Sequence, residues 1–266
     1  MDLTIVADNT PPFFTRYGFS RPNDSADSLT VEPYPEICTN ETLRATVVAS
    51  AIDLVGGLMT REIAGVDATF TSDLSLRIPA PGIPSRLDAR GQRIRAGKRL
   101  VTTGVTLEHD DGVYAYGETT FTRIARTVEN APSVAELSTP VAIPSHPLTQ
   151  PLAEEVGIEV VDPKRGEVAL AMRPGLLNPE GVMQGALVAL VVECAALAAS
   201  DGRDGHRRVV TEMDLRYLAA ASVGPVLSEA TWIGAPVAAM LRVELRDAGQ
   251  NDRLTASALV RLAKIP

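Results

Sequence analysis

Aromatic residues and cysteines are scarce in this chain of 266 residues. Only 4% of the residues are aromatic, so a core must be built mainly from Ala, Val, Leu and Ile. The two cysteines, Cys38 and Cys194, are too few for a disulfide framework and show no metal-ligand spacing. A phosphate-binding loop, a dinucleotide fingerprint and a Gly-x-Ser-x-Gly elbow are also missing. The sequence therefore gives no support for a nucleotide-binding protein or a serine hydrolase of these common types.

An excess of positive charge is missing as well. The net charge of -8 argues against general binding to nucleic acids or anionic membranes, so an anionic ligand needs a locally basic patch. The chain starts without the basic and apolar regions of a signal peptide, which predicts a cytoplasmic protein. Residues 182–199 are apolar but marginally short for a membrane span, and they contain Glu193. We interpret them as a buried helix and predict no membrane association.

The sequence repeats itself at an offset of about 140 residues. Residues 44–53 align without a gap with residues 184–193, and both segments end on a carboxylate, Asp53 or Glu193. Three more blocks match in the same order: 73–77 with 212–216, 105–107 with 243–245, and 121–124 with 259–262. Four ordered matches predict two units of one fold, at 1–130 and 152–266. The prolines of residues 131–151 predict a linker between them.

Each half shows the same order of expected elements. A strand (28–32 or 167–172) precedes a long apolar helix (41–59 or 183–200), and four strands follow. These strands are expected at 66–78, 85–95, 99–109 and 112–125, and at 207–218, 225–234, 237–247 and 252–263. A helix that is apolar almost all round must be enclosed. We therefore predict an α+β fold in which an antiparallel sheet curves around each helix, with the two units pairing edge to edge into one continuous sheet.

The most informative stretch is Asn178-Pro-Glu-Gly181-Val-Met-Gln184-Gly185-Ala186, followed by apolar residues up to Glu193. It resembles hotdog-fold acyl-CoA thioesterases of the PaaI type. Their pattern is Asn, a spacer, Gly, then His-Gly-Gly at the helix start and an acidic residue eight positions after the first glycine of that pair. The resemblance covers nearly all of residues 155–266, but Gln184 replaces the usual His and Ala186 the second Gly. It implies a tandem hotdog that hydrolyses acyl-CoA to free acid and CoA without a metal or redox cofactor.

The physical interpretation of these residues agrees with the resemblance. The Gly185 amide at a helix start is a suitable donor for a thioester oxyanion, and Asn178 or Gln184 can add a side-chain donor. Glu193 and Asp53 are the carboxylates inside the two apolar helices, where desolvation suits a general base. The resemblance allows donors and carboxylate to come from different units. The sequence leaves pairing within and between units open and ranks Glu193 first.

Each residue also has a structural interpretation. The carboxylate of Glu193 or Asp53 can simply bond to backbone or to an arginine of the other unit, Gly185 can serve close packing, and Asn178 can be a turn residue. The departures at Gln184 and Ala186 favour an alternative function, in which the protein binds an acyl thioester without cleaving it. A hydratase of the same fold usually pairs an Asp with a nearby His, and no such pair is visible.

A basic segment offers a site for the phosphates of coenzyme A. Residues 86–99 carry six basic side chains against one acid, Asp88, and arginine suits phosphate because of its bidentate fork. A solvated hairpin is the alternative interpretation. We also expect the chains to associate into a homo-oligomer. The residues expected to bind the phosphates are Arg90, Arg93, Arg95, Lys98 and Arg99.

Overall fold

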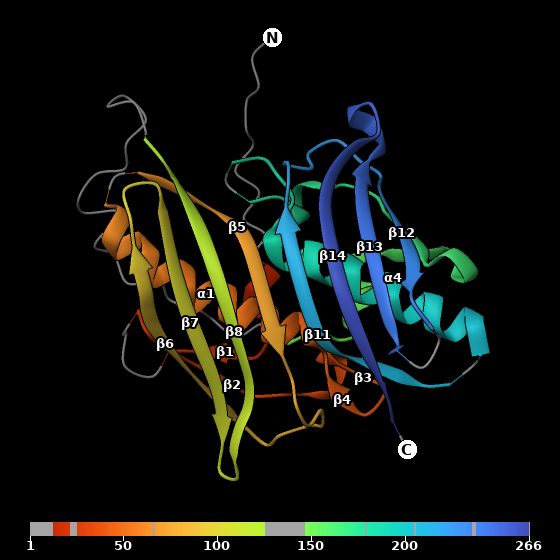
Figure 1. The fold of residues 1–266 in the computed structure, drawn as a ribbon, viewed down its shortest axis with the longest axis horizontal. Helices are drawn as coiled ribbons and strands as arrows, with labels where there is room; N and C mark the ends of the chain where they lie inside the picture. The colour runs from red at the N-terminus through yellow and green to blue at the C-terminus, as the bar shows by residue number, and fades with distance from the viewer. Residues whose placement is uncertain are drawn as a thin grey trace.

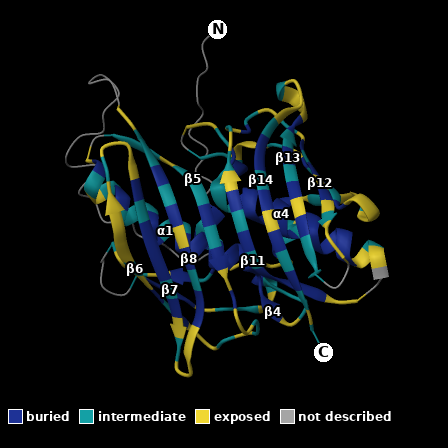
Figure 2. Cartoon of the chain, in the orientation of Figure 1, coloured by how far each residue is buried: buried dark blue, intermediate teal, exposed yellow. Residues whose placement is uncertain are grey.

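The computed structural model describes residues 13–21, 26–65, 67–125, 147–178, 180–204, 206–235 and 238–265. Figure 1 shows one broad twisted sheet with two long helices on the same face of it. These helices are α1 (Ala45–Ala64) in the first half and α4 (Gly185–Asp204) in the second. Figure 2 shows buried residues along both helices and along the strands in front of them, and these buried side chains form one core.

The large sheet has twelve strands in the order β1-β2-β6-β7-β8-β5-β11-β14-β13-β12-β10-β9, and every neighbouring pair is antiparallel. The first half supplies β1 (Phe19–Ser20), β2 (Ser28–Val31), β5 (Ala68–Arg77), β6 (Leu87–Ala96), β7 (Leu100–His109) and β8 (Gly112–Ile124). The second half supplies β9 (Ile158–Asp162), β10 (Glu167–Leu170), β11 (Arg208–Tyr217), β12 (Val226–Ile233), β13 (Met240–Asp247) and β14 (Arg253–Lys264). The predicted α+β fold of two helix-wrapping units is confirmed.

The two halves join through the antiparallel pair β5 and β11. On the helix side of this pair, Leu74 lies opposite Leu215 and Leu76 opposite Met213, and all four side chains are buried. On the outer face, Arg77 forms two bonds of 2.9 and 3.0 Å to Asp214. Exposed ion pairs contribute little, so the buried apolar pairs carry most of the stabilisation at this junction. The predicted edge-to-edge pairing of the two units is thus confirmed.

The sheet approaches α1 closely at Gly56. A Cβ at this position would lie 2.5 Å from the hydroxyls of Thr103 and Thr119, which bond to each other in the buried interior. Helix α4 is long and apolar enough to span a membrane by length and composition alone, but 72% of its apolar window is buried inside the protein. The interpretation of this segment as a buried helix is confirmed.

Some elements differ from the sequence predictions. Helix α1 begins at Ala45 rather than at residue 41, because residues 38–43 form a tight hairpin of β3 (Cys38–Thr39) and β4 (Thr42–Leu43). Asn40 and Glu41 turn this hairpin with positive φ angles of 48° and 62°. Helix α3 (Leu152–Val156) and strands β1 and β9 were not predicted. Most of the predicted linker, 131–151, lies outside the described residues, so its boundaries stay a prediction.

Candidate functional site

The two long helices pass each other at their N-terminal ends. The start of α4 at Gly185 lies beside Asp53 of α1, and the start of α1 at Ala45 lies beside Glu193 of α4. Because each carboxylate is eight residues into its helix, the helices overlap in opposite directions by about two turns. The chain therefore contains two related sites at the junction of the units, and each combines a helix start from one half with a carboxylate from the other.

The first of these, the Asp53 site, consists of Asp53, Thr71, Gly185, Ala186 and Tyr217. A Cβ at Gly185 would lie 3.5 Å from Asp53 Oδ2 and 3.6 Å from the Tyr217 hydroxyl oxygen. The Thr71 hydroxyl donates to Asp53 Oδ1 at 2.7 Å, and the Tyr217 hydroxyl donates to the Gly185 carbonyl at 3.2 Å. All five residues are partly exposed to solvent.

The electrostatics of the Asp53 site suit a base at near-neutral pH. Burial raises the pKa of Asp53 to about 6, and the hydrogen bond from Thr71 limits that rise. Burial and then the Asp53 charge raise the pKa of Tyr217 well above its ordinary value, so this hydroxyl remains a neutral donor. Opposite them, the amides of Gly185 and Ala186 have no hydrogen-bond partner among the described residues. They are first-turn amides at the positive end of α4.

The second site, the Glu193 site, consists of Arg44, Ala45, Thr46 and Glu193, and it is closed. Glu193 accepts hydrogen bonds from the amides of Ala45 and Thr46 at 3.1 and 3.2 Å, and another from the Thr46 hydroxyl. Arg44 Nη1 lies 3.8 Å from the same carboxylate, whose side chain is only 1% exposed. Glu193, which the sequence analysis ranked first as the catalytic carboxylate, thus occupies the amides at the start of α1.

The two predicted side-chain donors are engaged in the loop before α4. The Gln184 amide group donates to the carbonyls of Gly175 and Leu177 at 3.4 and 3.3 Å, and its oxygen accepts from the Phe13 amide. Asn178 Oδ1 accepts from the amides of Glu180 and Val182, both at 3.1 Å. Both residues brace the loop that leads into Gly185. The side-chain nitrogen of Asn178 bonds to no described residue and remains available as a donor.

The predicted phosphate-binding residues lie on β6 and in the turn that follows it, at the far end of the first unit from the junction. All of them are exposed, and Figure 2 shows the later part of β6 in the colour of exposed residues. A bulge between Arg93 and Arg95 shifts the alternation of the strand, so consecutive basic side chains do not share one face. The basic residues therefore lie in one region, but their side chains do not all point to the same place. They are Arg90, Arg93, Arg95, Lys98 and Arg99.

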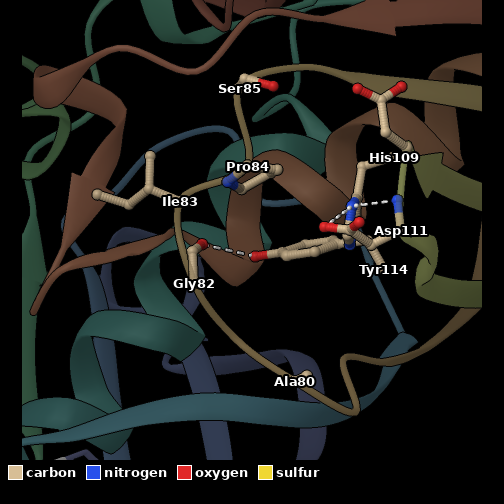
Figure 3. Close-up of a pocket in the computed structure, with 9 residues that line it drawn as sticks. Ala80, Gly82, Ile83, Pro84, Ser85, His109, Asp111 and Tyr114 are labelled. Carbon is tan, nitrogen blue, oxygen red and sulfur yellow. Dashed lines mark hydrogen bonds and ion pairs between the residues drawn. The ribbon is translucent and has the colours of Figure 1, made fainter.

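Two surface hollows lie elsewhere. One, of about 340 Å³, is formed beside the β7–β8 hairpin, and Figure 3 shows the Tyr114 hydroxyl bonded across it to the Gly82 carbonyl. Another, of about 400 Å³, lies over the ion pairs on the outer face of β5 and β11. Neither contains Asp53 or Gly185, and we assign the first no role in the chemistry.

Sequence reasoning did not single out Thr71 or Tyr217. Thr71 stands two residues before the repeated block 73–77, and Tyr217 stands directly after its counterpart 212–216. The aligned positions in the other half are Val210 and Ile78. A polar residue in one half that aligns with an apolar residue in the other half was therefore a usable sequence signal for the site.

Comparison with known proteins supports the fold. No protein-family model and no curated protein matches the chain by sequence. A structure named as a thioesterase from Novosphingobium aromaticivorans aligns with 94% of this chain and 99% of its own length, at 17% identity and a TM-score of 0.64. An acyl-ACP thioesterase from Bacteroides thetaiotaomicron (11% identity) aligns over 89% and 97%, with a TM-score of 0.59. A hotdog-fold protein of unknown function from Alicyclobacillus acidocaldarius (13% identity) aligns over 96% and 98%, with a TM-score of 0.55. The chain therefore has the tandem hotdog fold, and the PaaI subtype stays a prediction.

Proposed function

We propose that this protein hydrolyses an acyl thioester at the Asp53 site. The observation that carries the proposal is the placement of a half-buried carboxylate with a raised pKa across from the amides that begin α4, which have no partner among the described residues. The likeness to thioesterases of the same fold supports this reaction class over others that the fold can host. The substrate we propose is an acyl-CoA, as the sequence pattern at 178–193 implies.

The start of α4 would stabilise the charge that develops on the substrate. When a nucleophile adds to a thioester, the carbonyl oxygen becomes an oxyanion, and preorganised amides facing it lower the barrier. The Gly185 and Ala186 amides provide such donors, and the helix dipole adds positive potential there. Because Gly185 has no side chain, the carbonyl can approach the backbone closely between Asp53 and Tyr217.

Asp53 would act in one of two ways. As a general base, its carboxylate removes a proton from water while the water oxygen bonds to the carbonyl carbon. The carbon–sulfur bond then breaks, and the leaving sulfur takes the proton from Asp53. As a nucleophile, Asp53 displaces the thiolate to form a mixed anhydride, which water cleaves to free acid and Asp53. In both cases Thr71 holds the orientation of the carboxylate through its 2.7 Å hydrogen bond.

The rate should depend on pH through Asp53. Only the ionised carboxylate can act, so kcat/KM should fall tenfold per unit below a midpoint near pH 6. Thr71→Val removes a hydrogen bond that lowers this pKa, so the midpoint should move to higher pH. Both profiles can be measured by thiol release. A profile that is flat between pH 4.5 and 8, or a midpoint that Thr71→Val leaves in place, would contradict the role of Asp53.

The basic residues of β6 and its turn should contribute to binding the phosphates of coenzyme A. Replacing Arg93, Arg95 or Lys98 individually with Gln should raise KM by about 2- to 10-fold with little change in kcat, and added salt should reduce the difference. Arg86→Gln is the matched control, because Arg86 already pairs with Asp88 at 2.9 Å. Equal KM values in all four variants would place the nucleotide elsewhere.

The alternative is a protein that binds acyl thioesters without cleaving them. Gln184 favours it, because this residue stands at the usual His position and its side chain is committed to the loop backbone. Free-thiol release from a panel of short, long and aromatic acyl-CoAs separates the two. Turnover of any member supports hydrolysis, whereas saturable binding without thiol release would establish the alternative. Acyl-carrier-protein esters belong in the same panel.

A further inference from the structure

The Asp53 and Glu193 sites occupy equivalent positions in the repeat but differ in every polar feature. The helix starts are Gly185 and Ala186 in one site and Ala45 and Thr46 in the other. The former are partly accessible, whereas the latter are 2% and 0% exposed. At the repeat positions that correspond to Thr71 and Tyr217, the other half carries the apolar residues Val210 and Ile78, whose side chains are buried.

The difference in length between aspartate and glutamate accounts for what fills each site. Glu193 has one methylene more than Asp53 and reaches the two amides that begin α1. Asp53 accepts a hydrogen bond from the Thr71 hydroxyl instead, and leaves the amides of Gly185 and Ala186 without a partner among the described residues. A carboxylate of the chain itself therefore lies in the closed site at the place that a ligand carboxylate or an oxyanion would take.

A buried arginine shows that the closed site is built for an anion. The Arg44 side chain is only 8% exposed and points at Glu193, with Nη1 3.8 Å from Oε2. Its Nε and Nη1 atoms are buried and have no hydrogen-bond partner among the residues that the structure describes. Two amides, one hydroxyl and a buried guanidinium thus converge on one carboxylate. Such a group would be strongly destabilising without its anion.

We infer that the Glu193 site is a carboxylate-binding site occupied from within by Glu193, so that of the two related sites the Asp53 site is the one left to external ligands. Formate and acetate are the ligands that match the group now bound. The inference does not depend on hydrolysis at Asp53, because its test measures thermal stability and not turnover.

The test is chemical rescue of Glu193→Ala. This variant should melt on the order of 10 °C below the wild type, because a buried cation and two amides lose their partner. Acetate or formate should restore part of this loss in a saturable way, whereas chloride at equal ionic strength should not. Leu190→Ala is the matched control, since it removes a buried side chain from the same helix without removing an anion. Acetate should leave the melting temperatures of Leu190→Ala and the wild type unchanged.

Glu193→Gln extends the test if the alanine variant does not fold. It keeps the size and one acceptor oxygen but removes the charge, so it should also melt below the wild type. A Gln variant as stable as the wild type would overturn the inference, because the site would then not require an anion. Equal effects of acetate on Glu193→Ala and Leu190→Ala would overturn it too. Rescue confined to Glu193→Ala would establish the site even if no thioester is cleaved by the protein.

Discussion

Asp53→Asn is expected to lower kcat by about 100- to 10,000-fold, the range typical for removal of a general base. The amide is nearly the same size as the carboxylate and can still accept the hydrogen bond from Thr71, so the fold around it should be kept. What is lost is the ability to take a proton or to attack the carbonyl carbon. The measurement is thiol release under saturating acyl-CoA, with the variant shown to be folded by circular dichroism.

The same substitution should stabilise the protein at neutral pH. Burial raises the pKa of Asp53 from 3.8 to about 6, so the folded state disfavours the charged form. The favourable contribution of the protonated group is complete below pH 3.8 and is lost as pH rises through 6. Asp53→Asn removes this loss, and the gain at pH 8 is at most about 3 kcal/mol. Urea unfolding at pH 4 and pH 8 should show the gain only at pH 8.

The matched comparison is Glu193→Gln in the closed site. Under conditions where it remains folded, we expect this variant to lose thermal stability and not the chemical step. The opposite pattern, with a wild-type rate for Asp53→Asn and a large loss for Glu193→Gln, would move the reaction to the second site. Wild-type rates in both variants would remove carboxylate catalysis altogether.

The elements of the fold were predictable because two independent patterns agreed. The predicted helices at 41–59 and 183–200 are too uniformly apolar for a surface helix, and the strands that follow them alternate and repeat in the other half. The hairpin of β3 and β4 was missed because its strands have two residues each and carry no alternation. Its turn depends on positive φ angles at Asn40 and Glu41. Asparagine often adopts such angles, but glutamate rarely does, so the residue type at position 41 did not predict the turn.

The sequence predicted some members of the site, namely Asp53 and Gly185, but not how the carboxylates and helix starts pair. The repeat identified Asp53 and Glu193 as equivalent, and the motif pointed to Gly185, but only the three-dimensional arrangement brings Gly185 to Asp53 across the two units. The better local motif favoured Glu193, because sequence spacing within one helix says nothing about what faces that helix. Thr71 and Tyr217 come from β5 and β11, whose edge-to-edge pairing brings them together.

Asp53→Glu is expected to abolish most of the activity while keeping the negative charge. The added methylene should let the carboxylate reach the amides of Gly185 and Ala186, as Glu193 reaches those of Ala45 and Thr46. The donors for the oxyanion would then be occupied from within, and the loss in kcat should be at least about 100-fold, the typical effect of removing one such donor.

The control for this prediction is the direction of the stability change. A carboxylate that accepts amide hydrogen bonds at a helix start is stabilised in its charged form, so Asp53→Glu should melt at a higher temperature than the wild type at pH 7. Asp53→Asn should also be more stable than the wild type at this pH, but not at pH 4. Asp53→Glu should keep its higher melting temperature until the pH falls to the pKa of the new glutamate, which the amide hydrogen bonds lower. Activity of Asp53→Glu within tenfold of the wild type would show that the start of α4 stays open, and with it that side-chain length does not distinguish the two halves.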